Sequence, residues 1–260
     1  MSTILYPSPV FGPVISRRLG VSLGINLLPP DGKVCNFDCI YCECGFNKDF
    51  KAHLPFPSRE EVAEKLEEKL KVMKTEGVLP DVLTFAGNGE PTTNPSFPAI
   101  IDDTIRLRNQ YCPSAKVSVL SNSTLIHRPE IIEALLKVDN NILKLDTIDD
   151  AYIRKVDRPL QPSYSARKII ERLKAFKGKV IIQTLFMTGH SATGEDVDNT
   201  GDEYIHPWLE AVKEIAPREV MIYTIARETP DPNLRKASPE TLNAIRDRVI
   251  AMGIPCLASY

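Results

Sequence analysis

The chain has 260 residues, of which 43% are hydrophobic and 25% are charged, and its formal net charge is −2. This composition is ordinary for a globular protein with one large core or two smaller ones. There is no basic excess, so general nucleic-acid binding is not expected, and no apolar run approaches the roughly 18 residues that a membrane span needs.

Short apolar runs alternate with segments of helical periodicity. The runs are rich in β-branched residues and bounded by Gly, Asn, Asp or Pro, which predicts strands at 22–29, 81–87, 116–122, 141–147, 179–186, 219–226 and 255–259. Helices are predicted at 58–77 and near 96–110, 129–137, 165–176, 203–216 and 238–252. The first helix has a Ser58 N-cap, Glu61 three residues on and Gly77 at its end.

Repeated strand–helix units predict parallel strands joined by right-handed crossovers. Six clear strands, or seven with 255–259, are too few for a closed eight-stranded barrel. A partial barrel and a doubly wound sheet both remain, and in either one ligands bind at the carboxyl ends of the strands. No linker or repeat divides the chain, so we expect one domain over 1–260, in which 1–30 leads into the cysteines described next.

Four of the six cysteines lie close together, in the segment KVCNFDCIYCECG at 33–45. The amino terminus lacks the charged start and apolar core of a secretory signal, which predicts a cytosolic protein with reduced thiols. In that compartment a tight cysteine cluster indicates metal binding or catalysis rather than disulfides.

Three interpretations of these thiols stay open. A structural zinc ion usually takes its four ligands from two knuckles about a dozen or more residues apart, whereas here they would come from one short loop. Inert core thiols are seldom this dense beside residues such as Asp38 and Glu43. An iron–sulfur cubane normally takes four thiolates, so three of them would leave one iron open to a reactive ligand. We favour the cubane.

The spacing Cys35-x3-Cys39-x2-Cys42, with Tyr41 directly before the last cysteine, resembles the cluster motif of the radical S-adenosylmethionine (SAM) superfamily. The resemblance implies a [4Fe–4S] cluster on these three cysteines whose open iron chelates SAM. Reductive cleavage of SAM would then give methionine and a 5′-deoxyadenosyl radical that abstracts hydrogen from substrate. Tyr41 is expected near the adenine, and Cys44 lies outside the motif.

This resemblance also implies a low-potential electron donor as partner, such as flavodoxin or ferredoxin. With it, we expect an α/β fold in the form of a partial (β/α)6 TIM-like barrel, with parallel strands inside and helices outside. A non-enzymatic iron–sulfur or zinc-binding interaction protein is the opposed class of function.

The segment TFAGNGEPTTNP at 84–95 resembles the family's GGEP element, which contacts the amino group of SAM. The match gives that role to Gly89, Glu90 and Pro91, with Asn88 at the first glycine position. Glycine at 87 and 89 would let the backbone approach a ligand closely. An ordinary strand-to-helix turn is the alternative.

The segment VLSNSTL at 119–125 ends the next predicted strand and is similar to a family strand end that contacts SAM. The resemblance assigns Ser121 and Asn122 to SAM binding, and the alternative is simple turn chemistry.

The strand NILKLDT at 141–147 places Lys144 and Asp146 on one face and Leu143 and Leu145 on the other. The leucines can pack against helices, so the charged pair is expected inside the barrel, where it needs a mutual partner or a ligand. A structural salt bridge is the alternative to a catalytic role.

Three further features lie on the predicted strands or their carboxyl ends. Gln183 faces either the barrel interior or the helices, and Arg227 suits a carboxylate or phosphate, although Glu228 beside it is an equally available partner. Both are candidate catalytic residues. The acidic stretch 190–204 is either a lid or a solvated loop.

Several stretches, including 12–29 and VDRP at 156–159, make the chain similar to a compact group related to wyosine-type tRNA-modifying radical enzymes. Cys112 and Cys256 are isolated, so no second cluster is expected. We expect a small or nucleotide-like substrate inside the barrel. Arg17 and Arg18 could contact an anionic substrate, and a solvated or structural role is the equal alternative. The competing enzyme reading is activation or modification of a peptide or protein, as glycyl-radical activases do.

Overall fold

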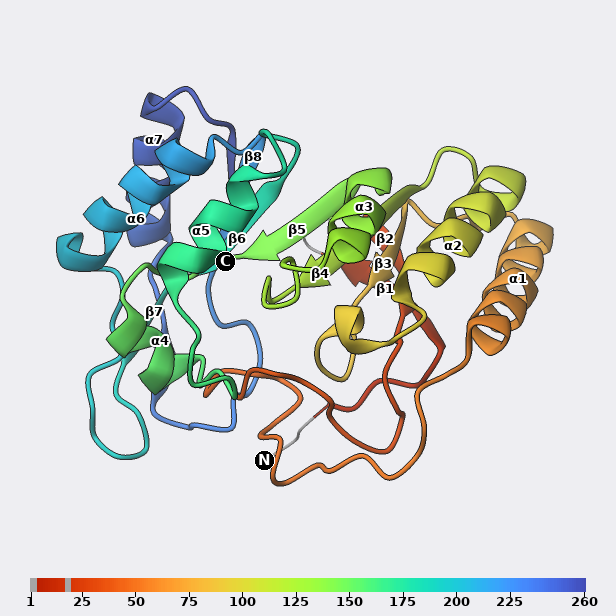
Figure 1. The fold of residues 1–260 in the computed structure, drawn as a ribbon, viewed down its shortest axis with the longest axis horizontal. Coiled ribbons are helices and arrows are strands. Elements are labelled where there is room, and N and C mark those ends of the chain that lie inside the picture. The colour runs from red at the N-terminus through yellow and green to blue at the C-terminus, as the bar shows by residue number, and fades with distance from the viewer. Residues whose placement is uncertain (1–3, 17–19) are drawn as a thin grey trace.

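The structure is a computed structural model that describes residues 4–16 and 20–260. Its main sheet runs in the order β1-β2-β3-β4-β5-β6-β8-β10 (Figure 1). The first pair, β1 (Val10–Ser16) and β2 (Gly20–Ile25), is antiparallel, and every later pair is parallel. The remaining strands are β3 (Val82–Phe85), β4 (Lys116–Ser121), β5 (Asn140–Lys144), β6 (Ile181–Leu185), β8 (Glu219–Tyr223) and β10 (Cys256–Ser259).

Helices connect the parallel strands and cover the outer side of the sheet (Figure 1). They are α1 (Arg59–Glu76), α2 (Phe97–Tyr111), α3 (Pro129–Lys137), α5 (Ala166–Lys174), α6 (Asp202–Ile215) and α7 (Pro239–Ala251). The short η1 (Pro91–Thr93) and α4 (Asp150–Val156) lie in the connections that follow β3 and β5. Within the described chain the edge strands β1 and β10 do not pair with each other, so the barrel stays open. The expected partial barrel is confirmed, with β10 as the seventh parallel strand.

Besides η1, four short elements were not predicted. The strand β1 has no clean alternation because its register shifts between Phe11 and Val14. The helix α4 has seven residues and is marked mainly by its N-cap, Asp149, which accepts hydrogen bonds from two backbone amides. The antiparallel pair β7 (Met187–Gly189) and β9 (Leu234–Lys236) has three residues in each strand, too few for a periodic pattern.

The principal core lies between the sheet and its helices, and Leu143 and Leu145 belong to it, as predicted. A second core beneath the cysteine segment joins Ile40 to residues of α4, β6, β7 and β9. Its other fully or nearly buried members are Tyr152, Val156, Leu185, Met187, Val197 and Leu234. The cysteine segment therefore rests on an apolar base.

Inside the barrel, inward side chains change from apolar to polar toward the carboxyl ends of the strands. Ile142, Ile181 and Met221 form a small buried cluster. Two residues further along β5 and β6, Lys144 and Gln183 are paired in register and line a cavity. The apolar cluster is thus the floor of a polar chamber, and Gln183 faces the interior.

The described residues contain no helix that is both long and apolar enough to cross a membrane.

Candidate active site

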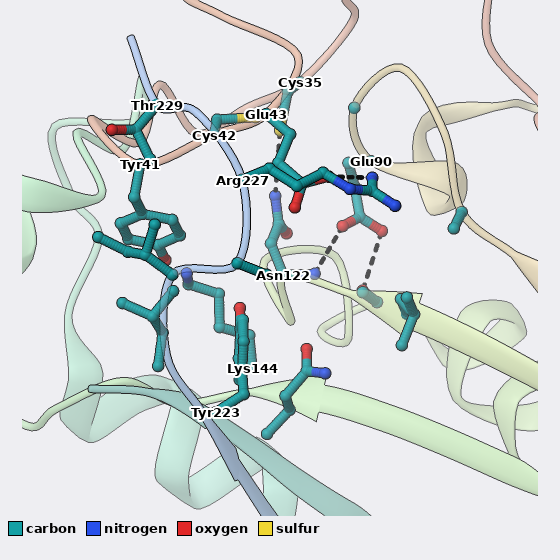
Figure 2. Close-up of a pocket in the computed structure, with 18 of the residues that line it drawn as sticks. Cys35, Tyr41, Cys42, Glu43, Glu90, Asn122, Lys144, Tyr223, Arg227 and Thr229 are labelled. Atoms are coloured by element: carbon teal, nitrogen blue, oxygen red, sulfur yellow. Dashed lines mark hydrogen bonds and ion pairs between the residues drawn. The ribbon is translucent and has the colours of Figure 1, made fainter. Parts of the chain in front are cut away.

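A cavity of about 310 Å³ opens at the carboxyl ends of the parallel strands (Figure 2). Its walls come from the cysteine segment and from the residues at or just after the ends of β3, β4, β5, β6 and β8. Ten of the thirteen residues to which the sequence assigned a cluster, SAM or catalytic role line it: Cys35, Tyr41, Cys42, Gly89, Glu90, Ser121, Asn122, Lys144, Gln183 and Arg227. The other three, Cys39, Pro91 and Asp146, are buried and do not line the cavity.

The cysteine segment is held from both sides by backbone hydrogen bonds. On one side, Val34 N donates to Asn88 O at 2.9 Å and Glu90 N donates to Val34 O at 3.0 Å. On the other, Asp38 N donates to Asp157 O at 3.0 Å and Ile40 N donates to Val156 O at 2.9 Å. Segments from two distant parts of the chain therefore clamp the cysteines between them.

The glycines of the 87–91 turn are needed for this clamp. Gly89 has φ +133°, and a Cβ there would lie 2.0 Å from Val34 O. A Cβ on Gly87, at φ +144°, would lie 2.4 Å from Asn26 Oδ1. The close approach that the sequence suggested is thus made by the protein's own chain, although both glycines also line the cavity.

Asn88, which stands where the family motif has glycine, ties down the amino-terminal segment. Its Oδ1 accepts a hydrogen bond from Tyr6 N at 2.7 Å, and its Nδ2 donates to Tyr6 O and Pro29 O, both at 3.0 Å. The asparagine is fully buried and does not reach the cavity wall.

Glu90 is a buried brace between the ends of β3 and β4. Its Oε1 accepts hydrogen bonds from Thr92 N and Oγ1 and from Ser121 Oγ, and its Oε2 accepts one of 2.6 Å from Asn122 N (Figure 2). Burial raises the pKa of Glu90, against these hydrogen bonds. The two predicted SAM-contacting turns are therefore one connected unit.

The three motif cysteines lie in different electrostatic surroundings. Burial raises the pKa of Cys35 to about 12, and its sulfur accepts hydrogen bonds from Phe37 N at 3.4 Å and Asn122 Nδ2 at 3.6 Å. Cys39 is buried and donates to Asp157 Oδ1 at 3.5 Å, and burial also raises its pKa. A hydrogen bond from Cys44 and the charge of Lys33 lower the pKa of Cys42 to about 6, against burial.

Among residues 4–16 and 20–260, no three His, Cys, Asp or Glu side chains gather closely enough to hold a single metal ion. A cubane cluster instead binds each thiolate to a different iron, so its sulfurs need not converge on one point. Three thiols on one clamped loop, two of them facing the cavity, suit such a cluster as donors. Cys44 is buried, and its thiol donates a hydrogen bond of 3.4 Å to Gly87 O.

A buried charge network backs the cysteines. Lys144 Nζ lies 2.6 Å from Asp146 Oδ2 and 3.0 Å from Asp157 Oδ1, and 4.4 Å from the centre of the Tyr41 ring. The Tyr41 hydroxyl donates to both carboxylates, at 2.5 Å and 2.8 Å. Burial disfavours the Lys144 ammonium, but the charges of Asp146 and Asp157 outweigh it and raise its pKa well above the usual value.

Asp157 is the functional candidate that the sequence did not single out. It lies within the VDRP stretch, which carried part of the family resemblance but no assigned role. Burial raises its pKa to about 6, while Lys144 acts to lower it. The sequence held one indication of such a residue. Lys144 was predicted to point inward, and a buried ammonium commonly needs more than one acceptor, so a second carboxylate besides Asp146 was to be expected.

Arg227 bridges the mouth of the cavity. Its Nη1 lies 2.6 Å from Glu43 Oε2 and 2.6 Å from the Tyr6 hydroxyl. From the sequence, the expected protein partner of Arg227 was the adjacent Glu228. The structure instead pairs Arg227 with Glu43 of the cysteine segment. The Arg227 side chain is 52% exposed, so it remains reachable from solvent.

The acidic stretch 190–204 packs against α4 instead of covering the cavity (Figure 1). Val197 is fully buried and its carbonyl accepts a hydrogen bond of 2.8 Å from the Tyr152 hydroxyl, while Lys155 Nζ donates to Asp196 O. The described part of the cavity wall contains none of 190–204. In this structure the stretch is not a lid over the cavity, and its tip at 192–196 is exposed to solvent.

Cys112 and Cys256 lie near the amino-terminal ends of β4 and β10, away from the cavity. Arg17 and Arg18 lie outside the described residues.

A family model described as the radical SAM superfamily matches residues 30–204, more than half of the chain. This chain belongs to the radical SAM superfamily. It is therefore an enzyme of a class that uses SAM and, as the superfamily implies, an iron–sulfur cluster. The other functional class considered from the sequence, a non-enzymatic iron–sulfur or zinc-binding interaction protein, is therefore rejected.

The radical SAM chain is also similar to curated proteins of two organisms. A UPF0026 protein of Methanocaldococcus jannaschii is 31% identical over 241 residues, which cover 90% of this chain and 69% of that protein. A UPF0026 protein of Helicobacter pylori is 34% identical over 187 residues, or 70% of this chain and 58% of that protein. This chain thus spans about three fifths to two thirds of these relatives.

Solved structures confirm the fold at lower identity. Streptococcus suis SuiB bound to S-adenosylmethionine superposes with a TM-score of 0.63 at 16% identity, over 88% of this chain and 49% of that one. The protein TYW1, solved with a lysine–pyruvate adduct, gives 0.59 at 15% identity, over 88% of this chain and 73% of that one. At this identity, both likenesses concern the fold.

Proposed function

We propose that this radical SAM enzyme holds a [4Fe–4S] cluster on Cys35, Cys39 and Cys42 and binds SAM in the adjoining cavity. When bound, the cluster supplies the electron that cleaves SAM to methionine and a 5′-deoxyadenosyl radical. The proposal rests on one observation: Cys35 and Cys42 line the same cavity as the side chains at the carboxyl ends of successive strands.

The chain's own residues would position SAM in this cavity. Gly89 and the Glu90-braced pair Ser121 and Asn122 present backbone and polar groups beside the cysteines. Pro91 fixes the exit of this turn as the first residue of η1. Tyr41, held through its hydroxyl by two carboxylates, offers its ring as one face of an adenine site.

We further propose that the substrate is small and either anionic or nucleotide-like. The cavity wall carries the charged or amide groups of Lys144, Gln183 and Arg227, which suit a polar or anionic substrate. The Gln183 amide makes no hydrogen bond within residues 4–16 and 20–260 and faces the cavity, so it is available to a ligand. Arg227 at the mouth can exchange Glu43 for a substrate carboxylate or phosphate.

Lys144 and Asp146 would act as a fixed charged pair in this site. A lysine that forms an imine with a keto acid must first be a neutral amine, which requires a lowered pKa. The two carboxylates raise the pKa of Lys144 instead. We therefore assign Lys144 to electrostatic orientation of SAM or substrate, and not to an adduct like the one described for TYW1.

Modification of a peptide or activation of a partner protein is the second candidate function. It would need an open, apolar groove able to admit a chain. A structure with SAM bound separates the two: an enclosed polar space next to the 5′ carbon supports a small substrate, and a wide apolar groove supports a peptide.

The decisive experiment for the general reaction is reductive SAM cleavage. The protein is reconstituted anaerobically, its iron and sulfide are measured, and SAM and dithionite are added. We expect 5′-deoxyadenosine and methionine in equal amounts, and none from Cys42→Ala. A fully loaded protein that yields no 5′-deoxyadenosine would refute the proposal.

In the cell we propose flavodoxin or ferredoxin as the electron donor, and the cytosol as the compartment, where thiols stay reduced. We also propose that the chain forms one catalytic domain, because one main sheet and one principal core run through it.

A further inference from the structure

Lys33 is a buried cation at the edge of the cysteine segment. Its side chain is 1% exposed, and its Nζ donates a hydrogen bond of 2.7 Å to Gly45 O. The nearest carboxylate is Asp38, whose Oδ1 lies 3.7 Å from Nζ and also accepts a hydrogen bond of 2.7 Å from Asn47 N. One neutral carbonyl and one long ion pair are weak compensation for a buried ammonium.

The hydrogen bond to Gly45 O ties Lys33 across the loop that carries the cysteines. Lys33 is two residues before Cys35, and Gly45 N donates a hydrogen bond of 2.9 Å to Cys42 O. The ammonium is therefore buried inside the loop that holds the three motif cysteines. It is also on the protein side of the segment, because it does not line the cavity.

We propose that Lys33 is a positioning residue that sets the reduction potential of the cluster, an inference that rests on the proposed cluster site. Adding one electron to the cluster adds one negative charge beside a buried ammonium. Coulomb attraction falls with distance and with dielectric, so a buried cation stabilises the reduced state much more than an exposed one does. Lys33 thus makes the cluster easier to reduce.

The chain offers a matched control. Lys51 lies opposite Lys33 in an isolated parallel bridge, but it is exposed. Removing either lysine changes the net charge equally, so a difference between them reports the burial of Lys33. Asp38→Asn should shift the reduction potential in the opposite direction, because it removes a negative charge next to Lys33. The asparagine keeps an acceptor for Asn47 N.

The experiment is an EPR-monitored redox titration of anaerobically reconstituted wild type, Lys33→Met, Lys51→Met and Asp38→Asn, without SAM. At a fixed potential, Lys33→Met should lower the ratio of reduced to oxidised cluster at least about tenfold, which is about 59 mV for one electron. Lys51→Met should leave the ratio unchanged, and Asp38→Asn should raise it.

Three outcomes would overturn the inference. The first is a Lys33→Met protein with full iron content and the wild-type potential. The second is a Lys33→Met protein that folds without a cluster while Asp38→Asn keeps the wild-type potential, because Lys33 would then only shape the loop through Gly45 O. The third is a wild type that binds no cluster, which would also refute the proposed function; the first two leave that function standing.

Discussion

The carboxylate of Asp157 accepts a hydrogen bond of 2.8 Å from the hydroxyl of Tyr41, and this contact joins the end of α4 to the cysteine segment. The same oxygen lies 3.0 Å from Lys144 Nζ and 3.5 Å from Cys39 Sγ. Asp157 is therefore the point where the cysteine loop, the Tyr41 hydroxyl and the inward lysine of β5 meet.

Asp157→Ala should destabilise the protein by about 3 kcal/mol, because it leaves the buried Lys144 with one carboxylate and Tyr41 with one acceptor fewer. Asp157→Asn keeps an acceptor for Tyr41 and should cost about 1–2 kcal/mol. Urea unfolding of the cluster-free protein measures both, and iron retention after reconstitution should fall in the same order. Equal stabilities for the two variants would contradict this account of the network.

Each of Cys35→Ala, Cys39→Ala and Cys42→Ala should abolish the cluster, whereas Cys44→Ala should keep most of it. Cys44 is the internal control because it lies outside the motif and its buried thiol donates a hydrogen bond of 3.4 Å to Gly87 O. Iron and sulfide per chain and the EPR signal of the reduced protein give the answer. Loss of the cluster from Cys44→Ala alone would show that the ligand set is different.

Gly89→Ala should cost about 3 kcal/mol and eliminate SAM binding, because a Cβ there would meet Val34 O at φ +133°. Gly77→Ala is the matched control: its φ is +73°, but a Cβ would meet nothing within 4 Å. It should cost about 1 kcal/mol and leave SAM affinity unchanged. Urea unfolding and equilibrium dialysis with SAM compare the two variants, and similar losses in both would argue against the clamp at Val34.

Asp139 gives a pH-dependent prediction away from the site. Burial opposes its ionisation, but hydrogen bonds from Val117 N at 2.8 Å and Arg108 at 2.9 Å outweigh this and lower its pKa. Because the folded pKa lies below the unfolded value of about 3.9, the stabilisation is complete above that pH and is lost as the pH falls below it.

Asp139→Asn should therefore cost about 1–2 kcal/mol at pH 7, and the gap from wild type should shrink below about pH 4. Urea titrations of the cluster-free protein at several pH values would show this. If the difference in free energy of unfolding between wild type and Asp139→Asn stayed constant down to pH 3, the charge of this carboxylate would not contribute to stability.

The periodicity of the sequence was sufficient for the parallel strands and the six longer helices, because each buries one regular face. It also placed Lys144 at the inner wall, since side chains alternate along a strand, but it left Gln183 facing either the interior or the helices. It could not reveal Asp157, whose contact with Cys39 spans 118 positions, or the burial of Lys33. These depend on which loops meet after folding, as does the pairing of Arg227 with Glu43.

The clamp on the cysteine segment has a consequence for synthesis. The Cys39–Asp157 contact closes a loop of 118 positions, so an emerging chain exposes its cysteines long before α4 and the VDRP stretch leave the ribosome. Only the amino-terminal half of the clamp, at residues 88–90, is available earlier. Cofactor insertion into a correctly shaped loop is therefore expected to be post-translational, and a chain truncated before residue 156 would present unprotected thiols to solvent.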